Sequence, residues 1–590
     1  MLFSFLATAA LLSAGAPVDT LQASAIVADR GLVVSRTDTV TVHTFQDASS
    51  VLLFVPSLYV GDYGSAAGLK SASLRGLGSA HTAIYLDGVR VGNVQSGQAD
   101  LGMMDLNDLS QVVVDYAQNS LSFRTARPVF HGKNVAGTAK LGFGSFGTWQ
   151  PYGKVAVKLN KGWSLSGHAG GIITNGEFPL ADGNKRINND FKQLQAGADL
   201  FGTFEGGDLH AKIFYNGSDR GTPGSLSWPS TDRQKDRNFG AQAVLRKNFS
   251  PLYTLHLSAK GAFDRLLYLS EWGDTDYKQT EFQLNSAHKF HLKSWWDVSL
   301  AADVAFDKLK STLYDHQRWA VVAAVASAFR WDVFKADVAL EYAGTFDKGT
   351  SPWNSLSPSV DLRLTLAEGL DLVAFGRRAF RTPTFNELYY PGYGNTELKP
   401  EDAWLADAGL DFGRDAGAWH FGAKVDGFYT YLTNKIVSAP TETDPSVWLP
   451  YNVGKAQTFG AEVQADVKYA AGDWMFSCMA RYSWQKATDK ATGAALPYIA
   501  AHSFVLNPIA SFKGWTLGLT WALKAGRKDS MGDMPNFNTL DAQLGKDFAL
   551  GNCSLGFRLT GRNLLDNRYE VISYYPMPGR SLMGGVVFKF

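Results

Sequence analysis

From about residue 135 onward the sequence repeats one pattern, in which segments of roughly ten residues alternate apolar and polar side chains and then break at Gly, Asp, Asn or Pro. In a strand that begins at Trp474, one face carries Trp474, Phe476, Cys478, Ala480, Tyr482 and Trp484. The opposite face carries Met475, Ser477, Met479, Arg481, Ser483 and Gln485. Aromatic rings bracket the apolar face over about 25 Å along the membrane normal once strand tilt is allowed for, and this is the height of a lipid-facing band. The pattern therefore predicts strands that cross a membrane.

Other segments repeat this alternation with the same chemistry. Apolar residues at 517, 519, 521 and 523 alternate with smaller or polar ones, as do those at 555, 557 and 559, and further copies occupy residues 253–263 and 421–431. One face of each segment can meet lipid, whereas the other needs water or buried polar partners. A closed barrel satisfies both faces and leaves no unpaired sheet edge.

The length after residue 135 indicates the size of the barrel. About 455 residues, at roughly 20 per strand and connection, support about 22 strands, the size class that holds a plugged lumen. We therefore expect residues 135–590 to form a transmembrane antiparallel β-barrel. The same length would fit a wide porin with long loops, so only the residues before 135 can indicate a plug.

Composition agrees with a barrel and disfavours several other classes. The 16 Trp, 23 Tyr, 37 Phe and 59 Gly suit many short strands with interfacial rings and crowded turns. The longest internal apolar run, 319–329, is far shorter than the roughly 18 residues of a transmembrane helix. A net charge of +1 argues against nucleic acid as a partner, and Cys478 and Cys553, the only cysteines, argue against a disulfide scaffold. A large soluble β-protein is the alternative fold.

Residues 1–16 are expected to be a secretory signal peptide. An apolar run over residues 1–12 is followed by the small residues Ala14, Gly15 and Ala16, which suit a cleavage pocket. The usual positively charged start is missing, and Pro17 follows the expected cleavage point directly. The alternative is a buried segment that is not cleaved.

Residues 37–134 show no lipid-band strands and are expected to form a small mixed α/β plug domain in the lumen. Residues 73–90 read SLRGLGSAHTAIYLDGVR. Asp87-Gly88 is a tight-turn dipeptide between alternating hydrophobic residues. Arg75 and Arg90 are candidate buried charges that would pair with carboxylates of the barrel wall. Polar contacts with water between them would hold a plug and still let it move.

This stretch resembles the plug signature of TonB-dependent receptors, in which an "IRG" strand leads to a "LIDGVR" strand. The matching residues are Arg75, Gly76, Asp87, Gly88 and Arg90. The resemblance extends over most of the chain and is closest to the cobalamin-receptor branch. FRTPTFNELY at 380–389, RNLLDNRYE at 562–570 and YPMPGR at 575–580 resemble motifs found throughout the family, and the terminal Phe590 resembles the barrel-insertion signal of outer-membrane proteins.

Residues 17–36 are expected to hold the TonB box and a linker. The residues that look like the box are Asp19, Thr20, Leu21, Gln22, Ala23, Ser24 and Ala25. An extended segment of this kind can add to the sheet edge of a periplasmic partner. The resemblance implies energy coupling by the TonB–ExbB–ExbD complex. Because the box begins directly after the expected cleavage point, we expect neither the extra domain of signal-transducing receptors nor the extension of SusC-type glycan importers.

The end of the plug departs from the family pattern. Where the family ordinarily has an "RGP.S..YG" run that leads into "GGVINI", this chain has YAQNS at 116–120 and VAGTAKL at 135–141. The departure leaves the position of the plug boundary undetermined by several residues. It also weakens the expectation that the lumen is unblocked in the way usual for the family.

Register with cobalamin receptors implies two outward plug loops, 59–69 and 92–102, as the first ligand contacts. The candidate ligand-binding residues there are Tyr59, Asp62, Tyr63, Asn93, Gln95, Ser96 and Gln98. Their rings, amides and hydroxyls suit a large ligand that is rimmed with amides. The alternative for each residue is an ordinary solvated loop position.

Two barrel segments, 175–190 and 216–236, are expected to be polar loops. Cobalamin receptors can order such loops with calcium, which takes several carboxylate and carbonyl oxygens. The candidate ligands are Asp182, Asp190, Asp219 and Asp232. Solvated loops have a similar composition without binding a metal.

The resemblance implies an outer-membrane receptor that imports a corrinoid such as cobalamin by active transport, with a surface lipoprotein as a candidate partner. A ferric-siderophore or haem receptor of the same fold is the alternative. No HExxH pair, Gly-x-Ser-x-Gly elbow or phosphate loop is present, so we do not expect an enzyme. A passive porin and an outer-membrane enzyme are the remote alternatives.

Overall fold

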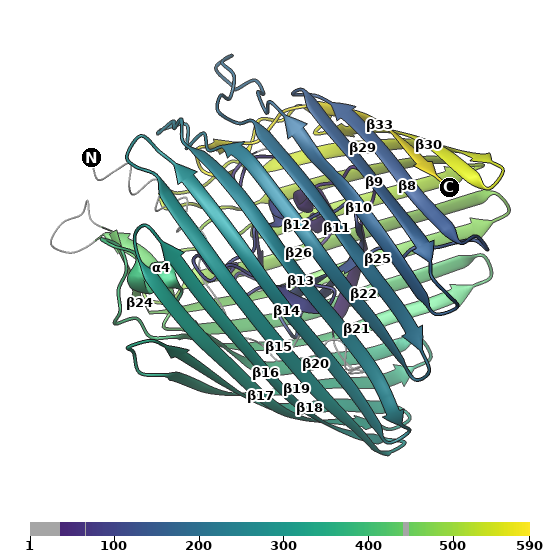
Figure 1. Cartoon of the computed structure of the whole chain (residues 1–590), viewed down its shortest axis with the longest axis horizontal. Helices are drawn as coiled ribbons and strands as arrows, with labels where there is room; N and C mark the ends of the chain where they lie inside the picture. The colour runs from purple at the N-terminus through teal and green to yellow at the C-terminus, as the bar shows by residue number, and fades with distance from the viewer. Residues whose placement is uncertain (1–35, 65, 441–447, 453) are drawn as a thin grey trace.

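The computed structural model describes residues 36–64, 66–440, 448–452 and 454–590. Within them, twenty-two antiparallel strands close a barrel around a small domain (Figure 1). The barrel strands are β8 (Val135–Gly144), β9 (Thr148–Lys158), β10 (Trp163–Thr174), β11 (Phe191–Phe204), β12 (Gly207–Gly221), β13 (Arg233–Ser250), β14 (Tyr253–Leu269), β15 (Thr275–Lys293), β16 (Trp296–Ser311), β17 (Asp315–Arg330), β18 (Phe334–Asp347), β19 (Trp353–Ala367), β20 (Leu370–Arg381), β21 (Glu401–Ala416), β22 (Trp419–Thr433), β25 (Lys455–Ala471), β26 (Trp474–Asp489), β27 (His502–Phe512), β28 (Trp515–Ala525), β29 (Phe537–Leu550), β30 (Cys553–Arg562) and β33 (Ser581–Lys589). The predicted barrel and its strand number are confirmed.

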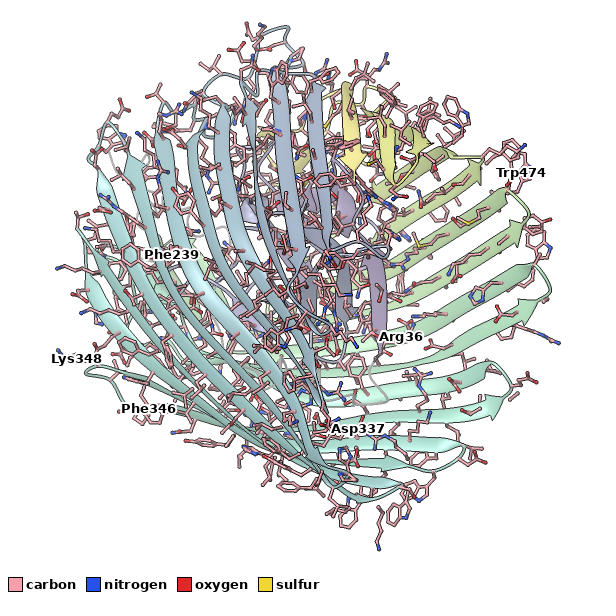
Figure 2. All side chains as sticks on the ribbon, turned by 45° about the vertical axis from the view of Figure 1, so that its right-hand side comes forward. Arg36, Phe239, Asp337, Phe346, Lys348 and Trp474 are labelled. Atoms are coloured by element: carbon pink, nitrogen blue, oxygen red, sulfur yellow. The ribbon has the colours of Figure 1, made fainter. Side chains whose placement is uncertain are left out.

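Side chains alternate across the wall as the sequence pattern predicts. On β26, Trp474, Tyr482 and Trp484 are exposed on the outer surface, whereas Arg481 and Ser483 are buried on the lumen side. Figure 2 shows Trp474, Phe239 and Phe346 on the outside of the barrel. The strands are longer than the predicted ten residues, and β15 has 19, because they continue beyond the lipid-facing band. The helices within the described ranges are all too short to traverse a bilayer.

The two ends of the barrel differ in the length of their connections. At one end the turns are as short as two residues, for example 205–206, 251–252 and 417–418. At the other end the loops are long, for example 175–190, 382–400 and 563–580. These loops contain α4 (Phe385–Tyr389) and two hairpins, β23 (Ile436–Pro440) with β24 (Trp448–Asn452) and β31 (Glu570–Ile572) with β32 (Tyr575–Pro576). Short turns face the periplasm and long loops face outward in such barrels.

The domain inside the lumen is a plug with a mixed sheet. Its strands β1 (Thr37–Thr41), β6 (Leu109–Asp115), β7 (Ser120–Thr125), β4 (Ala83–Leu86) and β5 (Val89–Val91) lie side by side in that order, and only the β4–β7 pair is parallel. A second hairpin joins β2 (Leu58–Asp62) to β3 (Lys70–Leu74), and the short helices are α3 (Ala48–Leu52) and η1 (Leu101–Met103). Val51, Leu74, Val112, Leu121 and Phe123 form its fully buried core. This confirms the predicted plug.

The two ends of the barrel sequence meet at one seam. β33 pairs with β8 from Met583 opposite Gly144 to Lys589 opposite Thr138. Beyond that register, the backbone groups of Phe590 and Gly137 bond to each other in both directions. A Cβ atom at Gly137 would lie 2.2 Å from the ring of Phe590, so this position accepts only glycine without rearrangement. Residues 126–134 connect the last plug strand to β8.

Candidate functional site

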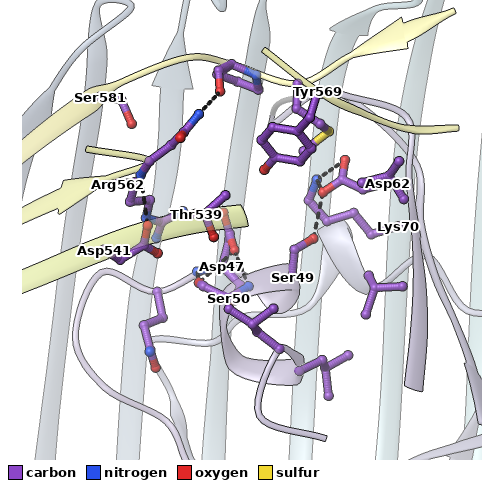
Figure 3. A pocket seen from close by; sticks show the side chains of 18 of the residues that line it. Asp47, Ser49, Ser50, Asp62, Lys70, Thr539, Asp541, Arg562, Tyr569 and Ser581 are labelled. Atoms are coloured by element: carbon purple, nitrogen blue, oxygen red, sulfur yellow. Dashed lines mark hydrogen bonds and ion pairs between the residues drawn. The ribbon is translucent and has the colours of Figure 1, made fainter. Parts of the chain in front are cut away.

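A first cavity, of about 340 Å³, opens between the plug and the long-loop end of strands β26 to β30, β33, β9 and β10 (Figure 3). Of the predicted ligand-binding residues, Tyr59 and Asp62 line it. Both belong to strand β2, so the predicted loop 59–69 is corrected to residues 63–69, because the β2–β3 ladder extends to the pair Asp62 and Lys70. The carboxylate of Asp62 accepts bonds from Lys70 Nζ at 2.9 Å and Ser49 Oγ at 2.6 Å.

The mouth of the first cavity joins the plug to the barrel wall. Asp47 caps helix α3 by accepting a bond from the backbone N–H of Ser50, and its carboxylate also lies 2.5 Å from Arg562. Burial favours the neutral acid, but Arg562 and Lys70 outweigh burial and hold the pKa of Asp47 well below its usual range. The charged residues that line the cavity are Asp47, Asp62, Asp541, Lys70, Lys524, Arg527 and Arg562, so cations are in slight excess.

A second cavity, of about 310 Å³, lies on the other side of the plug apex against strands β10 to β16. The remaining predicted ligand-binding residues line it: Tyr63, Asn93, Gln95, Ser96 and Gln98. Asn93 Oδ1 accepts bonds from the backbone N–H groups of Gln95 and Ser96 and thereby shapes the loop. The sequence therefore groups seven residues that the structure divides between two cavities.

Several residues that line the second cavity carry a buried polar atom without a hydrogen bond. Within the described residues, the Tyr63 hydroxyl, Gln95 Nε2 and Thr222 Oγ1 have no hydrogen-bond partner. In the described part of the chain, nine asparagine and glutamine side chains line the cavity: Asn93, Gln95, Gln98, Gln195, Asn216, Gln234, Asn238, Gln242 and Gln279. Its charged lining consists of Asp100, Asp105, Asp108, Asp236, Asp264, Lys212, Arg220, Lys260 and Arg265, in which carboxylates outnumber cations by five to four. The cavity is amide-rich and nearly neutral.

The hairpin of β31 and β32 lies between the two cavities and on the plug apex. The ring of Tyr575 meets that of Tyr63 edge-on, with centroids 4.9 Å apart. Gly64, at φ +89°, passes so close that a Cβ there would lie 2.8 Å from the carbonyl oxygen of Pro576. Burial raises the pKa of Tyr575 to about 12, so its hydroxyl stays neutral at physiological pH. The long loop 563–580 thus covers the plug from outside.

Comparison with known proteins agrees with this architecture. The family model for the "TonB dependent receptor-like, beta-barrel" matches residues 141–564, and the "TonB-dependent Receptor Plug Domain" matches residues 32–127. The chain belongs to the TonB-dependent receptors. It is 22% identical to the "Vitamin B12 transporter BtuB" of Photobacterium profundum, over 92% of this chain and 89% of that protein. As a family member with this barrel, the receptor is an outer-membrane protein.

Solved structures share the fold at lower identity. The FrpB iron transporter from Neisseria meningitidis superposes with a TM-score of 0.78 at 15% identity and covers 94% of this receptor and 99% of its own chain. The Serratia marcescens hemophore receptor HasR, solved with its hemophore and heme, also gives 0.78 at 15% identity, over 94% and 98%. Identities this low establish the fold and leave the ligand of this receptor open.

Arg75 of the plug signature anchors the plug of this receptor to the wall. Its guanidinium pairs with three fully buried barrel carboxylates: Asp407 at 2.8 Å, Glu462 at 3.0 Å and Asp426 at 3.1 Å. It also stacks between the rings of Tyr116 and Phe428, each 4.4 Å away. Burial lowers its pKa, but Glu462 and Asp407 outweigh burial and raise the pKa of Arg75 above its usual range. The expected pairing of Arg75 with wall carboxylates is present.

The other signature residues act in turns and close approaches. Asp87 and Gly88, at φ +52° and +84°, form the expected tight turn between β4 and β5, and the Asp87 carboxylate accepts bonds from Thr125. Gly76 sits where a Cβ would lie 2.8 Å from Thr458 Oγ1 of the wall. Arg90 is buried, and its carbonyl accepts a bond from Lys260.

The family motif at 380–389, together with Glu401 at the start of β21, also meets the plug. Arg381 is fully buried and bridges Glu387 at 3.2 Å and Glu401 at 2.5 Å. Glu387 closes a capping box with Thr384 at the start of α4. Glu401 in turn lies 2.6 Å from Nε2 of His81, inside the plug signature. Both motifs can be recognised in the sequence, but the sequence gives no sign that they are in contact.

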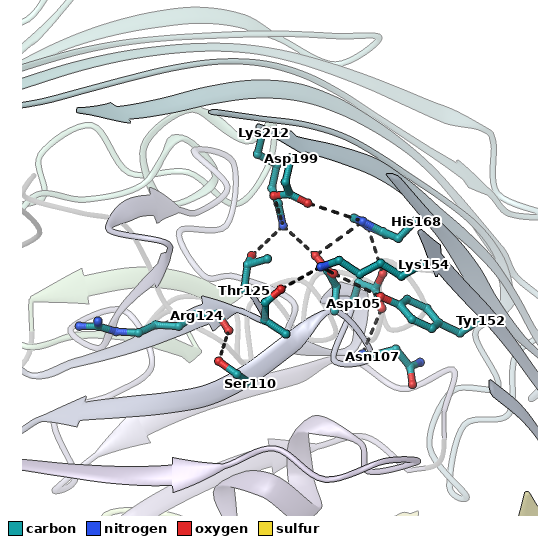
Figure 4. Close-up of polar contacts among 12 residues, drawn as sticks. Asp105, Asn107, Ser110, Arg124, Thr125, Tyr152, Lys154, His168, Asp199 and Lys212 are labelled. Carbon is teal, nitrogen blue, oxygen red and sulfur yellow. Dashed lines mark hydrogen bonds and ion pairs between the residues drawn. The ribbon is translucent and has the colours of Figure 1, made fainter. Parts of the chain in front are cut away.

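A second polar cluster joins the plug to strands β9 to β12 (Figure 4). Asp108 accepts bonds from Lys154 at 2.6 Å and Lys212 at 3.0 Å, and His168 and Asp199 lie beside them. Sequence reasoning missed all of these residues. Lys154, His168, Asp199 and Lys212 meet only through the register of neighbouring strands, which no local motif records.

The four aspartates proposed for calcium bond to other protein groups. Asp190 and Asp219 both pair with Arg233, at 2.8 and 2.7 Å, whereas Asp232 accepts a bond from the hydroxyl of Tyr268 and the exposed Asp182 binds Asn184. The predicted loop 216–236 is corrected to 222–232, because β12 extends to Gly221 and β13 begins at Arg233. Calcium binding stays a prediction.

The candidate TonB box, residues 19–25, and the signal peptide lie outside the described residues. Arg36, at the start of the described chain, pairs with Asp411 and Asp426 of the wall and lies inside the lumen (Figure 2). The chain is therefore tied to strands β21 and β22 at the last residue of the predicted linker segment.

Proposed function

We propose that this receptor binds a corrinoid such as cobalamin in the second cavity and imports it to the periplasm by TonB-dependent transport, without catalysing a reaction. The amide-rich, nearly neutral lining of that cavity carries the proposal. A corrinoid is a large ring rimmed with carboxamides, which offer both hydrogen-bond donors and acceptors. The unbonded Tyr63 hydroxyl, Gln95 Nε2 and Thr222 Oγ1 are suited to such groups, because a buried polar atom gains most from a ligand that satisfies it.

Charge favours this ligand over the alternatives. Ferric siderophores and haem commonly carry anionic groups, and their sites would gain from an excess of lysine and arginine. The lining of the second cavity instead has five carboxylates against four cations. The similarity to the vitamin B12 transporter of Photobacterium profundum also favours a corrinoid. The iron and heme receptors among the solved structures make ferric siderophore or haem the second candidate.

A titration of the purified receptor with cyanocobalamin, haemin and ferric siderophores tests the ligand. We expect saturable one-to-one binding of cyanocobalamin, weakened in Tyr63→Phe, which removes only the unbonded hydroxyl. Tyr59→Phe in the first cavity is the matched control and should bind normally. Binding of haemin or a ferric siderophore in place of cyanocobalamin would replace the corrinoid by the second candidate.

Uptake tests the energy coupling. Deleting residues 19–25 removes the candidate TonB box, so uptake of labelled ligand by cells should cease, whereas binding at the cell surface should persist. Unchanged uptake would contradict coupling through this segment to the TonB–ExbB–ExbD complex. A passive porin would instead conduct equally well with and without the plug. Measuring the conductance of a variant that lacks residues 17–134 tests this alternative.

A further inference from the structure

The cluster of Figure 4 combines metal-ligand atoms with an excess of negative charge. The ligand-type atoms of Asp108, His168 and Asp199 all lie within 4.8 Å of one another, and the three side chains are buried. His168 Nδ1 lies 3.6 Å from Asp108 Oδ2 and 3.8 Å from Asp199 Oδ2. In a tetrahedral zinc site with bonds of about 2.1 Å, neighbouring ligand atoms are roughly 3.4 Å apart. The three atoms are therefore already close to metal-ligand spacing.

Two of these atoms are buried and lack a hydrogen bond. His168 Nδ1 and Asp199 Oδ2 have no hydrogen-bond partner within the described residues, although His168 is about nine-tenths buried and Asp199 is fully buried. The other oxygen of Asp199 accepts a bond from His210 at 2.8 Å, so Oδ2 is the one directed at His168. A buried imidazole nitrogen and a buried carboxylate oxygen that have no hydrogen bond are suited to a shared cation.

The charges around this point do not cancel. Among the residues that the structure describes, four carboxylates, of Asp87, Asp105, Asp108 and Asp199, face the ammonium groups of two lysines, Lys154 and Lys212. The next lysine, Lys140, donates its bond to the carbonyl of Asn107 instead of a carboxylate. With neutral imidazoles, the cluster therefore keeps surplus negative charge in a buried place. A divalent cation would neutralise it, whereas protonation of His168 and His210 is the competing way.

The fold leaves room for the His168 ring and places it at the second cavity. Gly197 faces His168 across the β10–β11 pair, and a Cβ there would lie 2.7 Å from the imidazole Cε1. Asp105 lies 3.6 Å from Nε2, where it can orient the ring as the outer partner of a metal-bound histidine. Asp105, Asp108 and His168 line the inner end of the second cavity, which reaches the long-loop side.

We propose that Asp108, His168 and Asp199 bind one divalent transition-metal ion, with zinc as the best-fitting probe, and that this ion fastens the plug to the barrel wall. A mixed nitrogen and oxygen set of three protein ligands suits zinc, whereas calcium takes six to eight oxygens. Asp108 belongs to the plug, and His168 and Asp199 belong to β10 and β11. The ion therefore bridges the two domains, next to the point where β7 leads into the barrel.

Zinc titration of the full-length receptor, purified in detergent and stripped with EDTA, tests the site. We expect one equivalent of Zn²⁺ to bind, to be lost in His168→Ala and Asp199→Asn, and to bind roughly 10- to 100-fold more weakly in Asp105→Asn, the range for an outer partner. His256→Ala is the matched control, because His256 is also a buried lumen histidine but lies on β14. It should bind Zn²⁺ like the wild type.

A second measurement keeps the test valid if a variant fails to fold. Heat-modified mobility on gels shows whether the barrel of each variant has folded. A Co²⁺ titration needs no variant: the absorption spectrum of the wild type loaded with Co²⁺ should show the intense bands of tetrahedral coordination. Zn²⁺ should also slow protease cleavage of the wild-type plug, and excess Ca²⁺ should not displace it. Failure of the wild type to bind Zn²⁺, or equal binding by folded His168→Ala, would overturn the site without bearing on corrinoid binding.

Discussion

Removing the guanidinium of Arg75 should loosen the plug more than any other single truncation of its charged contacts. In Arg75→Ala, Asp407 and Glu462 lose their cation while both remain fully buried, and Asp426 keeps only Arg36. Leaving a buried charge without its partner costs about 3–5 kcal/mol. This corresponds to a roughly 10²- to 10⁴-fold increase in the population with a released plug.

Limited proteolysis of the plug across a urea gradient measures this population. Arg558→Ala is the matched control, because Arg558 pairs with the half-exposed Asp547 near the short-turn end and such a pair contributes about 1 kcal/mol or less. The triple variant Arg75→Met, Asp407→Asn, Glu462→Gln should recover much of the loss, since neutral groups of similar size remove the stranded charges. Equal protease sensitivity of Arg75→Ala and Arg558→Ala would refute the role of Arg75 as an anchor.

Three further predictions follow from single contacts. Tyr575→Ala removes the ring that covers Tyr63. Because an aromatic contact contributes about 0.5–1.5 kcal/mol, bound ligand should dissociate roughly 2- to 12-fold faster. Surface plasmon resonance measures this dissociation rate. The folded pKa of Asp47 lies below its ordinary 3.8. The stability from its pair with Arg562 should therefore be complete above about pH 4 and lost as pH falls through the folded value. Plug proteolysis measured from pH 6 to pH 3 should accordingly show no change in the upper half of that range. Gly137→Ala should slow or prevent assembly of folded barrel on gels, because its Cβ would overlap the ring of Phe590; normal yield would contradict this packing.

The barrel and the faces of its strands were predictable, because each strand must satisfy lipid on one side and water on the other. The same rule assigned Trp474 and Arg481 to opposite faces without any knowledge of their neighbours. The Asp87-Gly88 turn was equally local, since its backbone angles follow from two adjacent residue types. Local patterns of this kind carry their own physical cause.

The functional site was less predictable because its residues come from strands far apart in the chain. Tyr59 and Tyr63 are only four positions apart, yet β2 ends between them and they line different cavities. Asp190 and Asp219 looked like free loop carboxylates, but the pairing of β11, β12 and β13 places Arg233 beside both. His168 gave no signal at all, because its partners are supplied by other strands and by the plug.

The seam between β8 and β33 sets the order in which this barrel can be built. It joins residues about 450 positions apart, and its ladder is short, whereas neighbouring strands such as β14 and β15 pair along most of their length. Closing it therefore carries the largest loss of chain entropy for few backbone bonds. We therefore expect the wall to assemble before this ladder becomes favourable, and closure to be the last event of folding. The same ladder is the place where a sideways opening of the finished wall would start.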